Sequence, residues 1–399
     1  MADSHPSAAC IRSRKGLLAT WLAVAALSTG CAGSHRVPMS ELDRSRLLQG
    51  AGLLSDDTRA SQDLPTPESL LALDDDMRRF AREATRDAHG PRAKILALTA
   101  ALGSQDGLAL RYDAEATLSA VEVFRQHRAN CLSYAMLYIA LAREVGVDAR
   151  FNDVDIPPLW DLRGDGNFLI YRHINVRTED PTAKLVVDLA IEEYEQHYPQ
   201  RVISDRQAQA QYYNNRAIEL RLEGAGTEAL RYQLRALELD ARQAYLWNNL
   251  ASLYLLLDQP RAALLAVDTA LDLDPGYPAA YGTAAGIHRQ LGNLGVAARY
   301  HQRAENFQAR NPYYHYQLAL QALQQHDDRK AYEQARRAAV LNPQEPRFLF
   351  LVGVLLQSLE EPELARRSVE MAIQMSSSEQ QKARYRSKFE QLSPPRKPT

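Results

Sequence analysis

The feature that most constrains this chain's fold is a regular spacing of small residues in its second half. Alanine or glycine returns at intervals of 34 positions in three separate series. The series are Ala217, Ala251, Ala285, Ala319, Gly353; Ala229, Ala263, Ala297, Ala331, Ala365; and Ala236, Ala270, Ala304, Ala338, Ala372. Small residues at a fixed long period let paired helices approach closely, and each pair buries its apolar face by stacking on the next. We therefore predict an all-α superhelical solenoid, with units beginning near 210, 244, 278, 312 and 346.

The best unit is AYLWNNLASLYLLLDQPRAALLAVDTALDLDPGY, residues 244–277. It resembles a tetratricopeptide (TPR) repeat through Trp247, Leu250, Ala251, Tyr254, Ala263, Ala270 and Pro275. The resemblance implies five TPR repeats over 206–378. The polar segment 379–392 then reads as a capping helix, and 393–399 as a disordered tail.

A TPR solenoid has a concave face that binds an extended peptide or a partner helix. The family pattern places Asn214, Tyr245, Asn248, Tyr313, Tyr316 and Phe350 on that face. The basic residue pairs that clamp the carboxylate of chaperone tails are missing, which disfavours that class of ligand. The alternative for each tyrosine is that its ring only packs between neighbouring repeats.

The N-terminus has the pattern of an export signal. Basic residues precede the apolar run 17–27, whose eleven residues fall short of the roughly 20 that span a bilayer. The small residues 28–30 directly before Cys31 resemble the lipobox of bacterial lipoproteins. The resemblance implies that residues 1–30 are cleaved, that Cys31 carries the lipid, and that the chain is anchored to the outer membrane facing the periplasm. The alternative is an ordinary secretory signal. Residues 31–66 read as a flexible tether.

Cys131 is the only thiol expected to remain free in the mature chain, because Cys10 leaves with the signal and Cys31 is lipidated. It cannot form an internal disulfide, and a lone cysteine in an oxidising compartment is either buried or reactive. Asn130 is a good helix N-cap, and an apolar pattern continues to Gly146, so Cys131 lies in the first turn. Helix N-termini favour the thiolate. A nucleophile and a small core residue both remain open.

Three β-rich runs follow this helix: 147–151, 167–176 and 184–190. A hairpin that turns at Asp180 and Pro181 would set His173 directly opposite Asp188. Opposed side chains lie about 5 Å apart, close enough for a carboxylate to hold an imidazole. A slip of one residue would move Asp188 to the other face, so the prediction depends on the turn.

This order of thiol, histidine and aspartate resembles the papain-like core of bacterial transglutaminase-like domains. NCLSYAMLYIALAREVGVDARF is similar to their nucleophile helix, RHINV to their histidine strand and VVDLA to their aspartate strand. The resemblance implies an α+β domain over 67–205. In it Cys131 would attack an amide carbonyl, His173 would move the proton, and Asp188 would orient His173. The backbone N–H of Cys131, with Gln126 as a weaker candidate, would stabilise the oxyanion.

Several other classes of function have no support. The net charge is −2, without the basic excess that nucleic-acid binding requires. The histidines and cysteines show no zinc spacing, and there is no phosphate-binding glycine loop. Residues 161–167 begin like a calcium loop but carry Arg163 where a carboxylate belongs. We therefore expect no metal and no cofactor.

These observations predict a lipid-anchored periplasmic protein with a cysteine acyl-transfer or peptide-amide hydrolase domain and a TPR module that binds a protein substrate or partner. The alternative is a non-catalytic TPR assembly scaffold that keeps the triad as a structural remnant. The sequence leaves open the substrate, the choice between water and an amine as acyl acceptor, and the oligomeric state.

Overall fold

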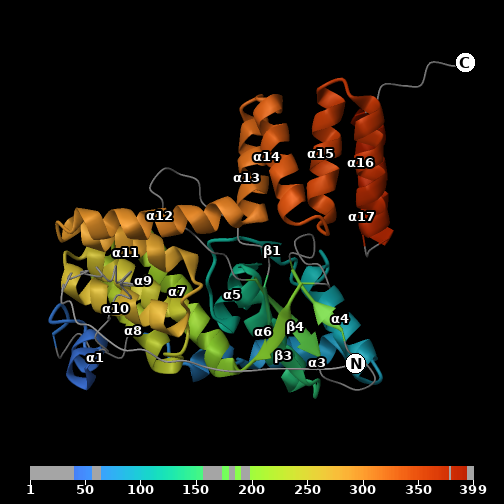
Figure 1. The fold of residues 1–399 in the computed structure, drawn as a ribbon. Coiled ribbons are helices and arrows are strands. Elements are labelled where there is room, and N and C mark those ends of the chain that lie inside the picture. The colour runs from blue at the N-terminus through green and yellow to red at the C-terminus, as the bar shows by residue number, and fades with distance from the viewer. Residues whose placement is uncertain are drawn as a thin grey trace, which may run out of the picture. The chain divides into compact units, whose positions relative to one another are not determined.

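The computed structural model describes residues 40–55, 64–155, 173–178, 185–189, 198–376 and 379–392. Along the chain, short helices and a small sheet come first, and paired helices follow (Figure 1). The predicted fold class, an α+β domain followed by an all-α solenoid of helical repeats, is confirmed.

The described residues begin with helix α1 (Glu41–Leu48), which starts at the N-cap Ser40. Leu47 is buried, and its carbonyl oxygen accepts a hydrogen bond from the Tyr254 hydroxyl, far away in the sequence. The expectation that all of 31–66 is a flexible tether is therefore wrong for this stretch. The segment has few apolar residues and no clear helical period, so its order depends on tertiary contacts that local sequence does not reveal.

The α+β domain is built around one apolar helix. Its elements before the sheet are η1 (Glu68–Leu71), α3 (Asp75–Ala84), α4 (Pro91–Gly103), the parallel pair β1 (Arg111–Tyr112) and β2 (Arg128–Ala129), α5 (Ala120–Gln126) and α6 (Cys131–Glu144). Every residue from Leu132 to Ala142 is buried. Helices α3, α4 and α5 and the sheet all contact α6. A helix surrounded in this way has no polar face, as its sequence indicates.

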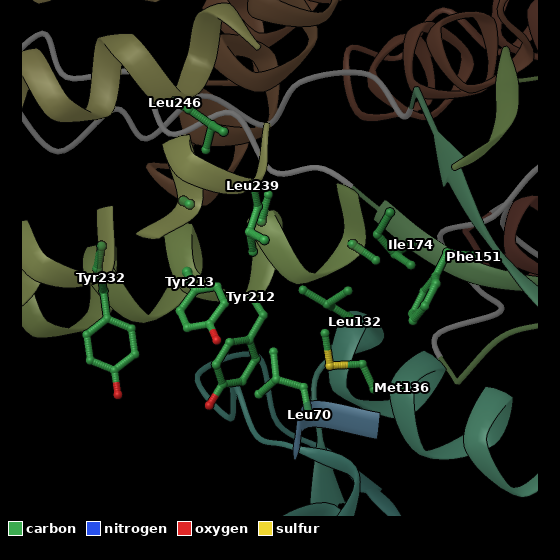
Figure 2. Packing of buried hydrophobic residues seen from close by; sticks show 14 of the residues in the cluster. Leu70, Leu132, Met136, Phe151, Ile174, Tyr212, Tyr213, Tyr232, Leu239 and Leu246 are labelled. Carbon is green, nitrogen blue, oxygen red and sulfur yellow. The ribbon is translucent and has the colours of Figure 1, made fainter. Parts of the chain in front are cut away.

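Within the described residues, the sheet has four antiparallel strands in the order β5-β4-β3-β6. They are β3 (Ala149–Val154), β4 (His173–Thr178), β5 (Val186–Val187) and β6 (Gln200–Ile203). One face presents Phe151 and Ile174 to the core, near Leu132 and Met136 of α6 (Figure 2). The other face is polar, yet its residues on β3 and β4 include several that are almost completely buried.

The solenoid consists of five helical hairpins and one further helix. The hairpins are α7 (Asp205–Leu222) with α8 (Gly226–Leu239), α9 (Ala244–Leu256) with α10 (Pro260–Leu273), α11 (Pro278–Gln290) with α12 (Leu294–Arg310), α13 (Pro312–Gln324) with α14 (Asp328–Leu341), and α15 (Pro346–Ser358) with α16 (Pro362–Met375); α17 (Glu379–Leu392) follows. The alanines of the three series are buried. At Gly353 an added Cβ would lie 2.5 Å from Val369 Cγ2, so this position requires glycine.

The joint between the third and fourth hairpins differs from the others. Asp240, Asp274 and Asn342 end their helices, and the side-chain Oδ1 of each accepts a hydrogen bond from the backbone N–H two residues on. Gln308 occupies the corresponding position in α12, and its longer side chain is not suited to this turn. Helix α12 therefore continues to Arg310. Helices α12 and α13 contact each other far less than the helices at the other joints do.

The buried residues form two separate clusters that divide at this joint. The larger cluster runs from Leu47 through the α+β domain to Ala304, and the smaller one contains residues of α13 to α16. Figure 2 shows Tyr212 and Tyr213 of α7 in the larger cluster with Leu70 and Leu132. The first hairpins therefore share a core with the α+β domain. The buried residues of the five described hairpins therefore do not form a single core.

Candidate functional site

Cys131 is the first residue of α6 and lies in its first turn. The N-cap side chain Asn130 accepts a hydrogen bond from Ser133 N at 2.9 Å and donates to Thr117 Oγ1 at 2.9 Å. Both ends of the capping amide are thus fixed, and Asn130 is itself buried. Cys131 is partly exposed and is a free thiol. Its backbone N–H, at the first helical position, has no acceptor within the helix.

His173 and Asp188 lie in direct contact, although not in the register that the sequence suggested. Strands β4 and β5 pair Val176 with Val187, so continuing the ladder sets Asp188 opposite Asn175 rather than opposite His173. The expected register was therefore wrong by two residues, and the turn that it assumed at 180–181 lies outside the described residues. A slip of two preserves the face of every side chain. Asp188 Oδ2 therefore still lies 2.5 Å from His173 Nε2, as a diagonal neighbour.

The electrostatic balance at His173 favours the imidazolium. Burial disfavours the charged ring, but hydrogen bonds to Asp188 and to Cys131, together with their charges, outweigh this and raise the pKa of His173 to about 10. The Nε2 atom pairs with Asp188, which leaves Nδ1 as the ring nitrogen for Cys131. The His173 and Asp188 side chains are only 3% and 1% exposed, so water screens this interaction little. The three side chains can thus hold and move one proton.

Two groups near Asp188 were not found from the sequence. Asn175 Nδ2 donates a hydrogen bond to Asp188 Oδ2 at 3.2 Å. Burial raises the pKa of Tyr134, one turn after Cys131, and the nearby charges of Tyr138 and Asp188 raise it further. The only sequence signal for Asn175 was a polar residue at the alternate position to His173 on a β-rich run. That signal has no meaning until the strand pairing is known.

The Gln126 side chain makes its hydrogen bond with Arg128. This glutamine side chain is exposed at the end of α5, and Oε1 accepts a hydrogen bond from Arg128 Nε at 3.2 Å. No hydrogen bond joins Gln126 to Cys131 within the part of the chain that the structure describes. Between them the chain takes a left-handed conformation at His127, with φ of 56°, and then forms β2. The role of Gln126 as an oxyanion donor stays a prediction.

The predicted inner-face tyrosines of the fourth hairpin make contacts within the chain. The rings of Tyr313 and Tyr316 each lie 5.1 Å from Phe348 between ring centroids. The Tyr313 hydroxyl donates to Glu345 Oε2 at 3.1 Å, and Arg347 pairs with the same carboxylate. The packing alternative therefore describes the observed contacts of both tyrosines, and peptide binding by them stays a prediction.

The other predicted inner-face residues are also engaged or covered. Asn214 accepts a hydrogen bond from Asn249 Nδ2 at 2.7 Å, and Phe350 stacks on Tyr385 of α17 with ring centroids 4.3 Å apart. Tyr245 packs partly buried against the larger cluster. Asn248 is buried, and its Oδ1 has no hydrogen-bond partner among the described residues.

Several sequence predictions fall outside the residues that the structure describes. These are the signal segment, Cys31, the turn at 180–181 and the rejected calcium loop at 161–167. Among the described residues, no cluster of three or more histidine, cysteine or acidic side chains could hold a metal ion. None of the described helices has the length and apolarity needed to cross a membrane.

Comparison with known proteins gives one family match. Residues 78–157 match the transglutaminase-like superfamily. The matched region contains Cys131 but ends before His173 and Asp188. No curated protein matches the chain.

Three solved structures similar to this chain each cover less than half of it. A crystal structure of MamA shares 19% identity over 44% of this chain and 95% of that chain, with a TM-score of 0.24. YrrB, described as a TPR protein with an unusual peptide-binding site, shares 19% over 45% of this chain and 92% of that chain, with a TM-score of 0.24. PilF of Pseudomonas aeruginosa shares 19% over 47% of this chain and 87% of that chain, with a TM-score of 0.26.

The helices of this chain themselves have the interval of TPR repeats. Helices α9, α11, α13 and α15 begin at 244, 278, 312 and 346, which keeps the 34-residue interval of the sequence. The chain therefore combines a region that matches the transglutaminase-like superfamily, residues 78–157, with a solenoid of helical repeats at the 34-residue TPR interval.

Proposed function

We propose that this protein is a cysteine acyl-transfer enzyme that acts on an amide bond of a protein or peptide. Cys131 is the nucleophile, His173 is the general acid and base, and Asp188 orients His173. The observation that carries the proposal is that one buried imidazole is bonded to a carboxylate on one side and to the only free thiol of the described residues on the other.

The reaction has two balanced halves. The Cys131 sulfur attacks the amide carbonyl carbon, the C–N bond breaks, and His173 gives its proton to the leaving amine. The product is a thioester. Water or a second amine then attacks that thioester, loses a proton to His173 and releases the acyl group as an acid or a new amide, while Cys131 is regenerated. The backbone N–H of Cys131 stabilises the oxyanion in both halves.

An acyl probe tests this step without knowledge of the natural substrate. With p-nitrophenyl acetate, we expect a burst of nitrophenolate equal to the protein concentration, and an acetyl group on Cys131 by mass spectrometry. His173→Ala should slow the burst by about a hundredfold or more, because general acid–base catalysis contributes at least that much. A burst that Cys131→Ser leaves unchanged would favour the alternative, a non-catalytic scaffold.

We further propose that the solenoid recruits the protein substrate or partner and that a lipid on Cys31 anchors the chain to the periplasmic face of the outer membrane. Support comes from the lipobox-like residues 28–31 and from the helical repeats. Cys31→Ser should move the protein from the membrane fraction to the soluble fraction or block its maturation. Unchanged fractionation would refute the anchor and leave the acyl-transfer proposal untouched.

A further inference from the structure

A chain of buried amides runs from β6 to the candidate site. Asn152 Nδ2 donates to Gln200 Oε1 at 2.9 Å and to Asn175 Oδ1 at 2.8 Å, and Asn175 Nδ2 donates to Asp188 Oδ2 at 3.2 Å. Asn152 and Asn175 are directly opposed on β3 and β4. They are 0% and 1% exposed, so the chain lies inside the protein.

The direction of the hydrogen bonds along this row of amides follows from the chemistry of the amide group. Each asparagine has one acceptor oxygen and one NH₂ group with two donors. Asn152 uses its NH₂ on two oxygens, so Asn175 presents its own oxygen to Asn152 and must present its NH₂ to Asp188. An NH₂ group in this position donates to a carboxylate oxygen, which can accept. The same Asp188 oxygen accepts from His173, so the two bonds fix its position together.

Packing alone does not account for these residues. Burying amides costs free energy unless their hydrogen bonds are made, and apolar residues would complete this sheet without that cost. The neighbouring opposed pair on the other face, Phe151 and Val176, is apolar and buried. Hydrogen bonds at such depth are strengthened by the low dielectric. The amides are placed where a carboxylate has to be held.

We propose that Asn175, held in turn by Asn152, is a positioning residue that fixes Asp188 against His173. The proposal rests on the acyl-transfer function above and extends it. Asn175 touches neither the thiol nor the bond that breaks, so it acts through Asp188. Its loss would remove one of the bonds that orient the carboxylate and would leave His173 less well oriented toward Cys131.

The test compares two variants of nearly equal size by the rate of Cys131 alkylation with iodoacetamide against pH. Asn175→Leu removes the donor, and we expect alkylation at pH 7 to slow about tenfold, the effect of losing one hydrogen bond to a charged group. Asn175→Asp should react at nearly the wild-type rate near pH 5, where it shares one proton with Asp188 and can donate. It should fail progressively as that proton is lost, because two carboxylates then face each other.

The matched control is Val176→Ala, at the adjacent buried position on the other face of β4. It loses packing but leaves the amide chain intact, so its alkylation profile should equal that of the wild type. If both Asn175 variants also keep the wild-type profile, the proposal is overturned. A purely structural role would not produce the pH-dependent loss in Asn175→Asp.

A second readout separates this proposal from the proposed function. If wild-type alkylation does not respond to His173→Ala, acyl transfer by this triad fails. The titration of the His173 ring by NMR then judges Asn175 alone. Asn175→Leu must move its midpoint to lower pH, because Asp188 is no longer held at Nε2, and Val176→Ala must not. An unmoved midpoint in Asn175→Leu would overturn the positioning role.

Discussion

The His173–Asp188 pair should make the stability of the fold depend on pH in a predictable direction. The pKa of His173 is raised from 6.5 to about 10 in the folded chain. The pair's stabilisation is therefore complete below pH 6.5 and is lost as pH rises to about 10, because only the folded chain holds the proton in that window. The perturbation that removes it is Asp188→Asn.

The structure sets the size of the effect. A raised pKa of this extent corresponds to about 5 kcal/mol, at about 1.4 kcal/mol per pH unit. Burial of both side chains means that solvent screening reduces it little. Asp188 raises the pKa of His173 more than Cys131 does, so we assign about 2 to 4 kcal/mol of this free energy to Asp188.

Urea unfolding of a Cys131→Ala chain from pH 6 to pH 10 measures the contribution of the His173–Asp188 pair to the free energy of unfolding. The Cys131→Ala change removes proton exchange between the thiol and the ring. We expect the free energy of unfolding of the Cys131→Ala chain to fall by about 2 to 4 kcal/mol relative to Cys131→Ala/Asp188→Asn over that range. Other titrating groups cancel in the difference. Parallel curves for the two chains would refute the reasoning, because the His173–Asp188 bond would then carry no net free energy.

Three further predictions concern the repeats. Gly353→Ala should lower the free energy of unfolding in urea by about 1 to 3 kcal/mol, because the added Cβ would lie 2.5 Å from Val369 Cγ2. The double variant Gly353→Ala/Val369→Ala should recover part of this loss. Losses of the two single variants that simply add in the double variant would contradict this contact. Gln308→Asp should restore the turn at the end of α12 and speed amide exchange at residues 309 and 310, whereas unchanged protection would mean that another feature extends the helix. A chain that ends at Arg310 should keep the wild-type alkylation profile of Cys131, and a chain that ends at Ser204 should lose it. The shorter chain lacks Gln209 and Tyr213, which donate hydrogen bonds to the carbonyls of Pro67 and Pro65. Equal profiles in the two shortened chains would argue against the shared core.

The solenoid could be predicted well because its signal is a repeat. Each small residue meets the same neighbour in every hairpin, so errors at single positions do not change the reading. The break after the third hairpin also left a trace, in Gln308 where three of the other units have Asp or Asn. That trace is one methylene group in one side chain, and its meaning became clear only beside the three turns of Asp240, Asp274 and Asn342.

The site could be predicted in part. Asn130 and Cys131 follow local capping rules, which depend on neighbours in sequence. The meeting of His173 with Asp188 depends on strand register, and an error of two residues did no harm only because side chains alternate with period two. Asn175 and Asn152 are joined by pairing across strands, which local sequence does not reveal. Helix α1 was missed for the same reason, since distant residues hold it.

The most direct test of the central claim is the rate of Cys131 alkylation by iodoacetamide at pH 6.5 and 8.5, in protein that begins after Cys31. A free cysteine, whose thiol ionises near pH 8.5, is alkylated about fiftyfold more slowly at pH 6.5 than at pH 8.5. We predict that the alkylation rate of wild-type Cys131 falls less than about fivefold over this interval, because the His173 imidazolium favours the thiolate. In His173→Ala the rate should fall about fiftyfold, as for a free cysteine. A wild-type profile like that of a free cysteine, or a slow reaction indifferent to His173, would make Cys131 a core residue and contradict the account.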